Sequence, residues 1–146
     1  MEYILGLDMK YIVRKQFDEK DEEIADVLTS LGLSRPIAKT LSYLKDLKEA
    51  TSVELERVTG LRQPEVSIVM RDLKQRDWIS EREEKKPGKG RPFKIYSLKL
   101  SFKEIIASFE KQKMKEFNEI QSNIKRLKDS VTIMAKSYSG EGHHSA

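Results

Sequence analysis

The stretch RVTGLRQPEVSIVMRDL, residues 57–73, decides the fold. It ends one short helix at Gly60 and begins another at Pro64, a residue that suits the first turn of a helix. Apolar residues then recur at a spacing of three or four and predict a buried stripe of Val66, Val69, Met70 and Leu73. The opposite face carries Ser67, Ile68 and Arg71. A helix that restarts so soon either closes a small core or is presented to a partner.

Three helices are predicted upstream of this stretch. The segment DEKDEEIADVLTSLGL, residues 18–33, predicts a first helix whose apolar face carries Ile24, Val27, Leu28 and Leu31. A second helix is expected to follow Ser34 as its N-cap. In TSVELERVTG, Thr51 and Glu54 have the spacing of a capping box, so a third helix of barely two turns is expected to end at Gly60.

Downstream, the apolar period changes from helical spacing to strict alternation. WISERE (residues 78–83) and FKIYSL (residues 93–98) are short β-rich runs, and the segment between them is rich in Pro and Gly. The pattern predicts a β-hairpin. Its tip is basic and holds no acid between its first and last cation: Lys85, Lys86, Lys89, Arg91 and Lys94. Such a charge run can also be a solvated hairpin tip without a function.

This element order, with a short helix, a tight turn, a second helix and then a basic hairpin, is that of a winged helix-turn-helix. The expected fold class is therefore mainly α with a small β-hairpin, followed by a long C-terminal coiled-coil helix. In such folds the second helix lies in the DNA major groove, so Ser67 and Arg71 are candidates for base contacts. Lys89 and Arg91 are candidates for phosphate or minor-groove contacts from the hairpin tip.

Four motifs within residues 31–98 resemble those of archaeal winged-helix transcription regulators, nearest the TrmB-like group and more loosely the MarR and ArsR groups. They are LGLS at 31–34, ATSVELERVTGL at 50–61, VSIVMRDLKQRDWI at 66–79 and GRPFKIYSL at 90–98. The resemblance implies that Arg62, Gln63, Ser67 and Arg71 face DNA, with Ile68 beside them on the exposed face. It also implies that the wing consists of Lys85, Lys86, Lys89 and Arg91. TrmB-like sugar regulators continue into a large effector domain that has no counterpart here, so no effector is predicted.

The C-terminal segment from 101 to 138 lacks Gly and Pro and is predicted to form one long helix. Its apolar residues alternate gaps of three and four and predict a heptad seam for dimerisation: Phe117, Ile120, Ile124, Leu127, Val131 and Met134. The alternative is a helix that folds back on its own domain. We favour a homodimer, because a palindromic DNA site is read by a two-fold protein.

The remaining segments are less informative. Residues 1–18 fit a strand or a helix, and we expect them to pack against the long helix. The winged domain is expected at 19–100, the dimerisation helix at 101–138 and a flexible tail at 139–146. His143 and His144 in that tail lack a third ligand and predict no metal site. The adjacent Glu83 and Glu84 would point to opposite faces of a strand and form no catalytic pair.

Composition narrows the function classes. The chain has no cysteine, which excludes disulfides and thiolate chemistry and fits a reducing cytoplasm. No apolar run is long enough to cross a membrane. No nucleophile–base pair or phosphate-cradling glycine motif is present, so neither an enzyme nor a cofactor is expected. We predict a sequence-specific regulator that binds double-stranded DNA; the alternative is an adaptor that uses the same surfaces to hold proteins together. Neither the operator nor the sign of regulation follows from the sequence.

Overall fold

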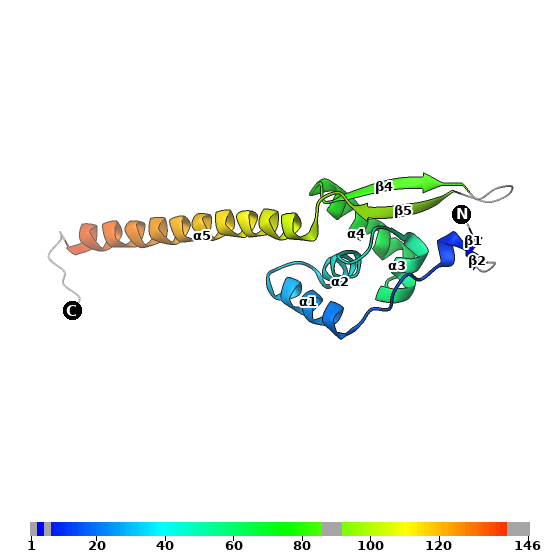
Figure 1. Cartoon of the computed structure of the whole chain (residues 1–146). Coiled ribbons are helices and arrows are strands. Elements are labelled where there is room, and N and C mark those ends of the chain that lie inside the picture. Colours follow the sequence, from blue (N-terminus) through cyan, green and yellow to red (C-terminus); the bar gives the residue numbers. More distant parts are fainter. Residues whose placement is uncertain (1–2, 5–6, 86–91, 140–146) are drawn as a thin grey trace. The chain divides into compact units, whose positions relative to one another are not determined.

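The computed structural model describes residues 3–4, 7–85 and 92–139 of the chain. The chain divides into two compact units, Met1–Lys103 and Glu104–Ala146. The first unit contains four helices: α1 (Glu19–Ser30), α2 (Arg35–Leu44), α3 (Ser52–Thr59) and α4 (Gln63–Gln75). In it, α1 packs along α2, and α2, α3 and α4 pack around one another (Figure 1).

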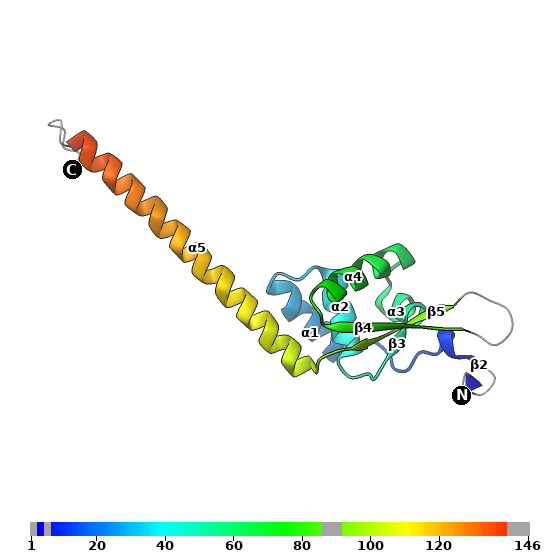
Figure 2. The same ribbon diagram turned by 90° about the horizontal axis from the view of Figure 1, so that it is seen from above.

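A three-stranded antiparallel sheet completes the winged fold. Its strands are β3 (Ala50–Thr51), β4 (Ile79–Glu84) and β5 (Phe93–Leu98), in the order β3-β5-β4. The hairpin register pairs Ile79 with Leu98 and Glu84 with Phe93. Figure 2 shows β5 between β3 and β4. The fold class predicted from the sequence, mainly helical with a basic hairpin, is therefore confirmed.

The core lies between the helices and the sheet. The predicted stripe of α4 is buried in full, at 0–2% exposure for Val66, Val69, Met70 and Leu73. Leu41 and Leu44 of α2 are buried in the same core, as are Ile79 and Ile95 of the sheet. Removing this much apolar surface from water is the main force that holds α4 in place.

The helix ends differ in detail from the prediction. Thr51 caps α3, accepting a hydrogen bond from the Glu54 backbone N–H at 3.1 Å. The Glu54 carboxylate, however, turns inward to Arg14 and Tyr43, so the predicted reciprocal capping box is wrong. Gly60 ends α3 with φ at +74°, a left-handed conformation that glycine adopts without strain. This is what lets the chain restart as α4 after so few residues.

The predicted face of α1 is only partly right. Leu28 is buried as predicted, but Val27 and Leu31 are about half exposed, and α1 buries Asp21 and Ala25 instead. Hydrophobic periodicity misplaces part of the buried face, because it treats an acidic residue such as Asp21 as solvent-facing.

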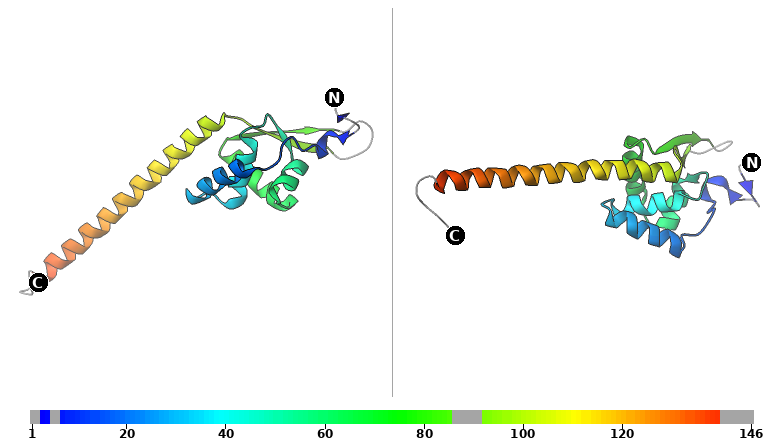
Figure 3. Two further views of the ribbon diagram at one scale, coloured as in Figure 1. Left: turned by 60° about the horizontal axis from the view of Figure 1, so that its bottom comes forward. Right: turned by 60° about the vertical axis from the view of Figure 1, so that its left-hand side comes forward.

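Before α1, the chain forms β1 (Tyr3–Ile4), β2 (Leu7–Asp8) and a 3₁₀ turn, η1 (Met9–Tyr11). η1 lies against α3, and Figure 3 shows this N-terminal segment from two further directions. The second unit holds most of α5 (Phe102–Ser139), an uninterrupted helix of 38 residues as predicted. Among the described residues, no helix has the length and apolar character of a membrane span.

Candidate nucleic-acid interface

The exposed face of α4 carries the predicted recognition residues. Gln63, Ser67 and Arg71 are all exposed, on the side opposite the buried stripe. Arg62 precedes the helix as its N-cap, and its backbone N–H donates to the Glu65 carboxylate at 3.1 Å. The polar side chains are thus held on a helix whose other face is locked into the core.

A trough runs between α4 and the hairpin. It consists of two adjoining depressions that share Ser67, Lys94 and Tyr96. One is lined further by Lys10, Ser52, Val53, Gln63, Val66, Pro92 and Phe93. The other is lined further by Met70, Arg71, Lys74 and Glu81. We call this surface the helix–hairpin trough; it combines polar, cationic and apolar residues from four parts of the fold.

Glu81 is the one acid among the described residues that line the trough. Its carboxylate pairs with Lys74 at 3.3 Å and with Lys94 at 3.7 Å. Burial, together with the charge of Glu81, raises the pKa of Tyr96 to about 12. Glu81 therefore holds two lysines beside the recognition face and offsets part of their charge.

The wing is described only in part. Lys85 follows β4 directly and is exposed. The predicted wing residues Lys86, Lys89 and Arg91 lie outside the described residues. On the face of β4 opposite Glu81, Arg82 pairs with Glu49, which directly precedes β3, at 2.6 Å and with Glu84 at 3.1 Å. The hairpin strands are thus tied to the winged unit next to the point where the basic loop begins.

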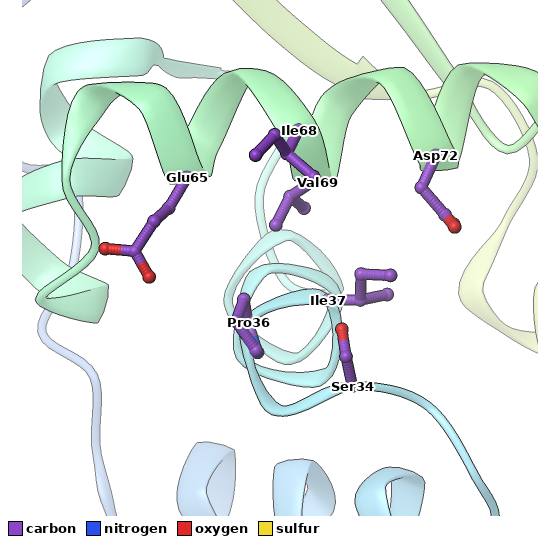
Figure 4. Close-up of a pocket in the computed structure, with 7 residues that line it drawn as sticks. All are labelled: Ser34, Pro36, Ile37, Glu65, Ile68, Val69 and Asp72. Atoms are coloured by element: carbon purple, nitrogen blue, oxygen red, sulfur yellow. The ribbon is translucent and has the colours of Figure 1, made fainter.

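Ile68 stands apart from the other recognition residues. It is 62% exposed and lines an apolar groove between α2 and α4 rather than the helix–hairpin trough. Figure 4 shows Pro36 and Ile37 of α2 facing Ile68 and Val69, with Glu65 and Asp72 on either side. The α4 surface thus has a basic side toward the hairpin and an apolar side with acidic flanks toward α2.

The sequence patterns did not predict how residues 10–15 pack; we call these residues the N-terminal strap. Thr51 Oγ1 donates to the Lys10 carbonyl at 2.7 Å. The Arg14 backbone N–H donates to Glu54 Oε2 at 2.9 Å, and its guanidinium pairs with the same carboxylate. Lys15 Nζ lies 2.9 Å from both carboxylate oxygens of Asp21. The strap is therefore fastened to the winged unit. Thr51 and Glu54 lie about 40 residues from the strap residues that they hold, too far for a local sequence pattern to reveal the contact.

Two fully buried carboxylates, Asp21 and Glu54, anchor the strap. Burial by itself would raise the pKa of Asp21, but the ammonium groups of Lys45 and Lys15 outweigh it and lower that pKa to about 2. The Tyr43 hydroxyl has one proton and two acceptors in reach, Glu54 Oε2 at 2.6 Å and the Lys15 carbonyl at 2.9 Å. Burial and the Glu54 charge raise the pKa of Tyr43 above its ordinary value. A buried carboxylate without its cation is costly, so both acids favour a docked strap.

The seam predicted for α5 consists of large apolar side chains at the surface. Their exposure ranges from 44% to 67%: Phe117, Ile120, Ile124, Leu127, Val131 and Met134. Ile133, which lies off the seam, is 67% exposed as well. Among the described residues, no group of three or more His, Asp or Glu side chains is placed to hold a metal ion.

No protein-family model matches the chain, and no curated protein is significantly similar to it. Among solved structures, it is similar to a transcriptional regulator at 20% identity, with 76% of this chain and 75% of that one covered and a TM-score of 0.48. It is also similar to MepR, a transcription regulator of the Staphylococcus aureus multidrug efflux pump MepA (17% identity, 82% and 90% covered, TM-score 0.44). A third similarity is to a MarR family transcriptional regulator from Silicibacter pomeroyi DSS (17% identity, 83% and 80% covered, TM-score 0.44). Likenesses this distant do not assign the chain to a family.

Proposed function

We propose that this chain is a sequence-specific transcription regulator that binds double-stranded DNA as a homodimer in the cytoplasm. The observation that carries the proposal is the exposed face of α4. Gln63, Ser67 and Arg71 project from a helix that is fixed to the core on its other side, beside a trough that holds Lys74 and Lys94. A helix with this support can enter the major groove without losing its own packing.

The two elements of the interface have different roles in this proposal. Arg71 and Ser67 contact base edges, and Arg62 and Gln63 contact the groove near the start of α4. Ile68 offers an apolar side chain, which suits the methyl group of thymine. The wing, with Lys85, Lys86, Lys89 and Arg91, contacts phosphates. On its sequence motifs we place the chain nearest to the TrmB-like winged regulators.

The homodimer is proposed from the seam of α5. Six large apolar side chains in a heptad pattern need burial, and an identical helix offers the matching seam. Phe117, Ile124 and Val131 then occupy a positions, and Ile120, Leu127 and Met134 occupy d positions. In the middle of the seam, β-branched Ile124 and Val131 at a flank Leu127 at d, the combination that favours two strands and suits a protein that reads two half-sites.

The proposal is tested by measuring binding to labelled duplex DNA at several salt concentrations, followed by selection of bound fragments from a random pool. Phosphate contacts make log affinity fall linearly with log salt, by about 0.9 per contact. Neutralising the four wing cations together should flatten that slope and weaken all sequences alike. A chain that binds no duplex at low salt, or selects no common sequence, would contradict a sequence-specific regulator.

The apolar groove between α2 and α4 favours a second candidate, an adaptor that binds another protein. Its floor of Pro36, Ile37 and Val69 beside the exposed Ile68 is less suited to a phosphate backbone than the helix–hairpin trough is. The salt titration separates the two functions, because an adaptor has no DNA affinity that salt can weaken.

A further inference from the structure

The geometry points to the N-terminal strap as a third DNA-contacting element, in which Lys10 neutralises a backbone phosphate at the edge of the major groove. This inference rests on the proposed DNA-binding function. It goes beyond the recognition helix and the wing, which together make up the interface expected from the sequence.

The placement of Lys10 carries the inference. Lys10 lines the helix–hairpin trough together with Gln63 and Ser67 of α4, Ser52 at the start of α3 and Lys94 of β5. If α4 lies in the major groove, the phosphates of one strand pass the start of α4, where this part of the trough lies. Two lysines, two hydroxyls and an amide are the kind of donors that proteins use on phosphates.

Lys10 is held in this place by a contact of its own backbone and by contacts farther along the strap. Its carbonyl accepts from Thr51 Oγ1 at 2.7 Å, and Thr51 is itself buried. Farther along, Arg14 and Lys15 are fixed on the buried carboxylates of Glu54 and Asp21. An ordered backbone loses less conformational entropy when it binds, so a lysine here is a better phosphate ligand than one on a free chain end.

A second cation is gathered at the same end. The Tyr11 ring lies 4.9 Å from Lys10 Nζ and 5.2 Å from the Arg57 guanidinium carbon. The Tyr11 ring is thus within cation–π range of both cations. Both cations add positive potential that attracts a phosphate. A lysine is a compact point charge on a flexible stem, which suits a phosphate contact better than base reading.

The test compares Lys10→Ala, Lys10→Arg and Lys20→Ala on a random-sequence duplex across a range of salt. Lys20 is an exposed lysine of α1 that lines neither part of the trough, which makes it a matched control. We expect Lys10→Ala to lower affinity by up to about tenfold and to reduce the salt slope by about 0.9 per protomer. Lys10→Arg should keep the slope, and Lys20→Ala should change neither quantity. Thermal unfolding of each variant checks that the fold is kept.

The outcomes separate this inference from the proposed function. If the unaltered protein binds no duplex, both are overturned. If it binds with the usual salt dependence and Lys10→Ala leaves the slope unchanged, the strap makes no phosphate contact and only this inference falls. An affinity loss with an unchanged slope also overturns it, because Lys10 would then act through folding alone.

Discussion

Asp21 illustrates what a single residue contributes to this protein. Its carboxylate is fully buried, and it binds Lys15 and Lys45 while the Ser42 hydroxyl donates to its backbone carbonyl. Lys45 in turn has a raised pKa; burial opposes this, but the carboxylates of Asp21 and Asp46 outweigh the burial. One acid thus joins the strap, α1 and the end of α2.

The first prediction at this scale concerns acid unfolding. The pKa of Asp21 is about 2 in the folded chain and 3.8 in the unfolded one, so its stabilisation is complete above about pH 4 and is lost as pH falls through 2. Asp21→Asn should cost on the order of 2 kcal/mol at neutral pH and remove this pH dependence. Urea unfolding between pH 2 and 7 measures both effects.

Asp26→Asn is the control, because Asp26 lies on the same helix as Asp21 but forms an exposed pair, with Arg35 at the start of α2. Exposed pairs contribute roughly 0–1 kcal/mol, so this variant should stay close to the unaltered protein. Equal losses in the two variants would show that the Asp21 network contributes no more than a surface pair.

Arg71 is the residue on which sequence preference should depend most. An arginine that grips guanine at two points contributes roughly 1–3 kcal/mol of discrimination against the wrong base. Arg71→Ala should therefore relax preference at particular positions of the selected site. Lys74→Ala, three residues on along the same helix, should weaken all sequences by a similar factor. Binding titrations on the site and on its single-base variants measure this, and an equal loss on site and random DNA would reverse the assignment.

At the scale of elements, the trough between α4 and the hairpin depends on charges from both. Glu81 on β4 pairs with Lys74 of α4 and Lys94 of β5, so it both positions these lysines and repels phosphates. Changing Glu81 should therefore change the affinity of this interface for DNA.

We expect Glu81→Gln to raise affinity for every duplex and to steepen the salt slope, because two lysines are released and one negative charge is removed. Glu84→Gln is the matched control: it lies on the same strand but on the other face, where it pairs with Arg82. The measurement is the affinity of both variants for random DNA across a range of salt concentrations. Weaker binding by Glu81→Gln would mean that Glu81 serves mainly to hold the lysines in place.

The elements also differ in how far the sequence predicts them. The stripe of α4, the short α3 and the hairpin follow from local periodicity and turn residues, and all three predictions are confirmed. Local patterns fail where an acid is buried, because Asp21 and Glu54 look like solvent-facing residues until their partners are known. Arg14 and Glu54 are 40 residues apart, so only the folded chain brings them together. Lys10 and Thr51 are 41 residues apart, so the sequence around the recognition helix does not predict that Lys10 lies near it.

At the scale of the whole molecule, the proposed function depends on how many winged units act together. The seam of α5 leaves six apolar side chains at least 44% exposed. Two winged units joined by such a seam would bind two half-sites as one ligand, and their joint affinity would exceed that of either unit.

Changing Ile124 and Leu127 to Gln should convert the dimer to a monomer and weaken binding to a two-half-site operator far more than binding to one half-site. Ile133→Gln is the control, because Ile133 is equally exposed but lies off the seam. Light scattering gives the mass of each variant. A double variant that keeps the dimer mass would place the dimer contact elsewhere, and an unaltered protein that is already monomeric would contradict the homodimer.

The N-terminal strap also sets an order of events during synthesis. Chains are made from the N-terminus, so residues 10–15 leave the ribosome before the residues that hold them. Thr51 follows Lys10 by 41 residues and Glu54 follows Arg14 by 40. Lys10 and Arg14 therefore lack these partners until α3 has emerged. The docking of the strap must wait for residues made about 40 positions later.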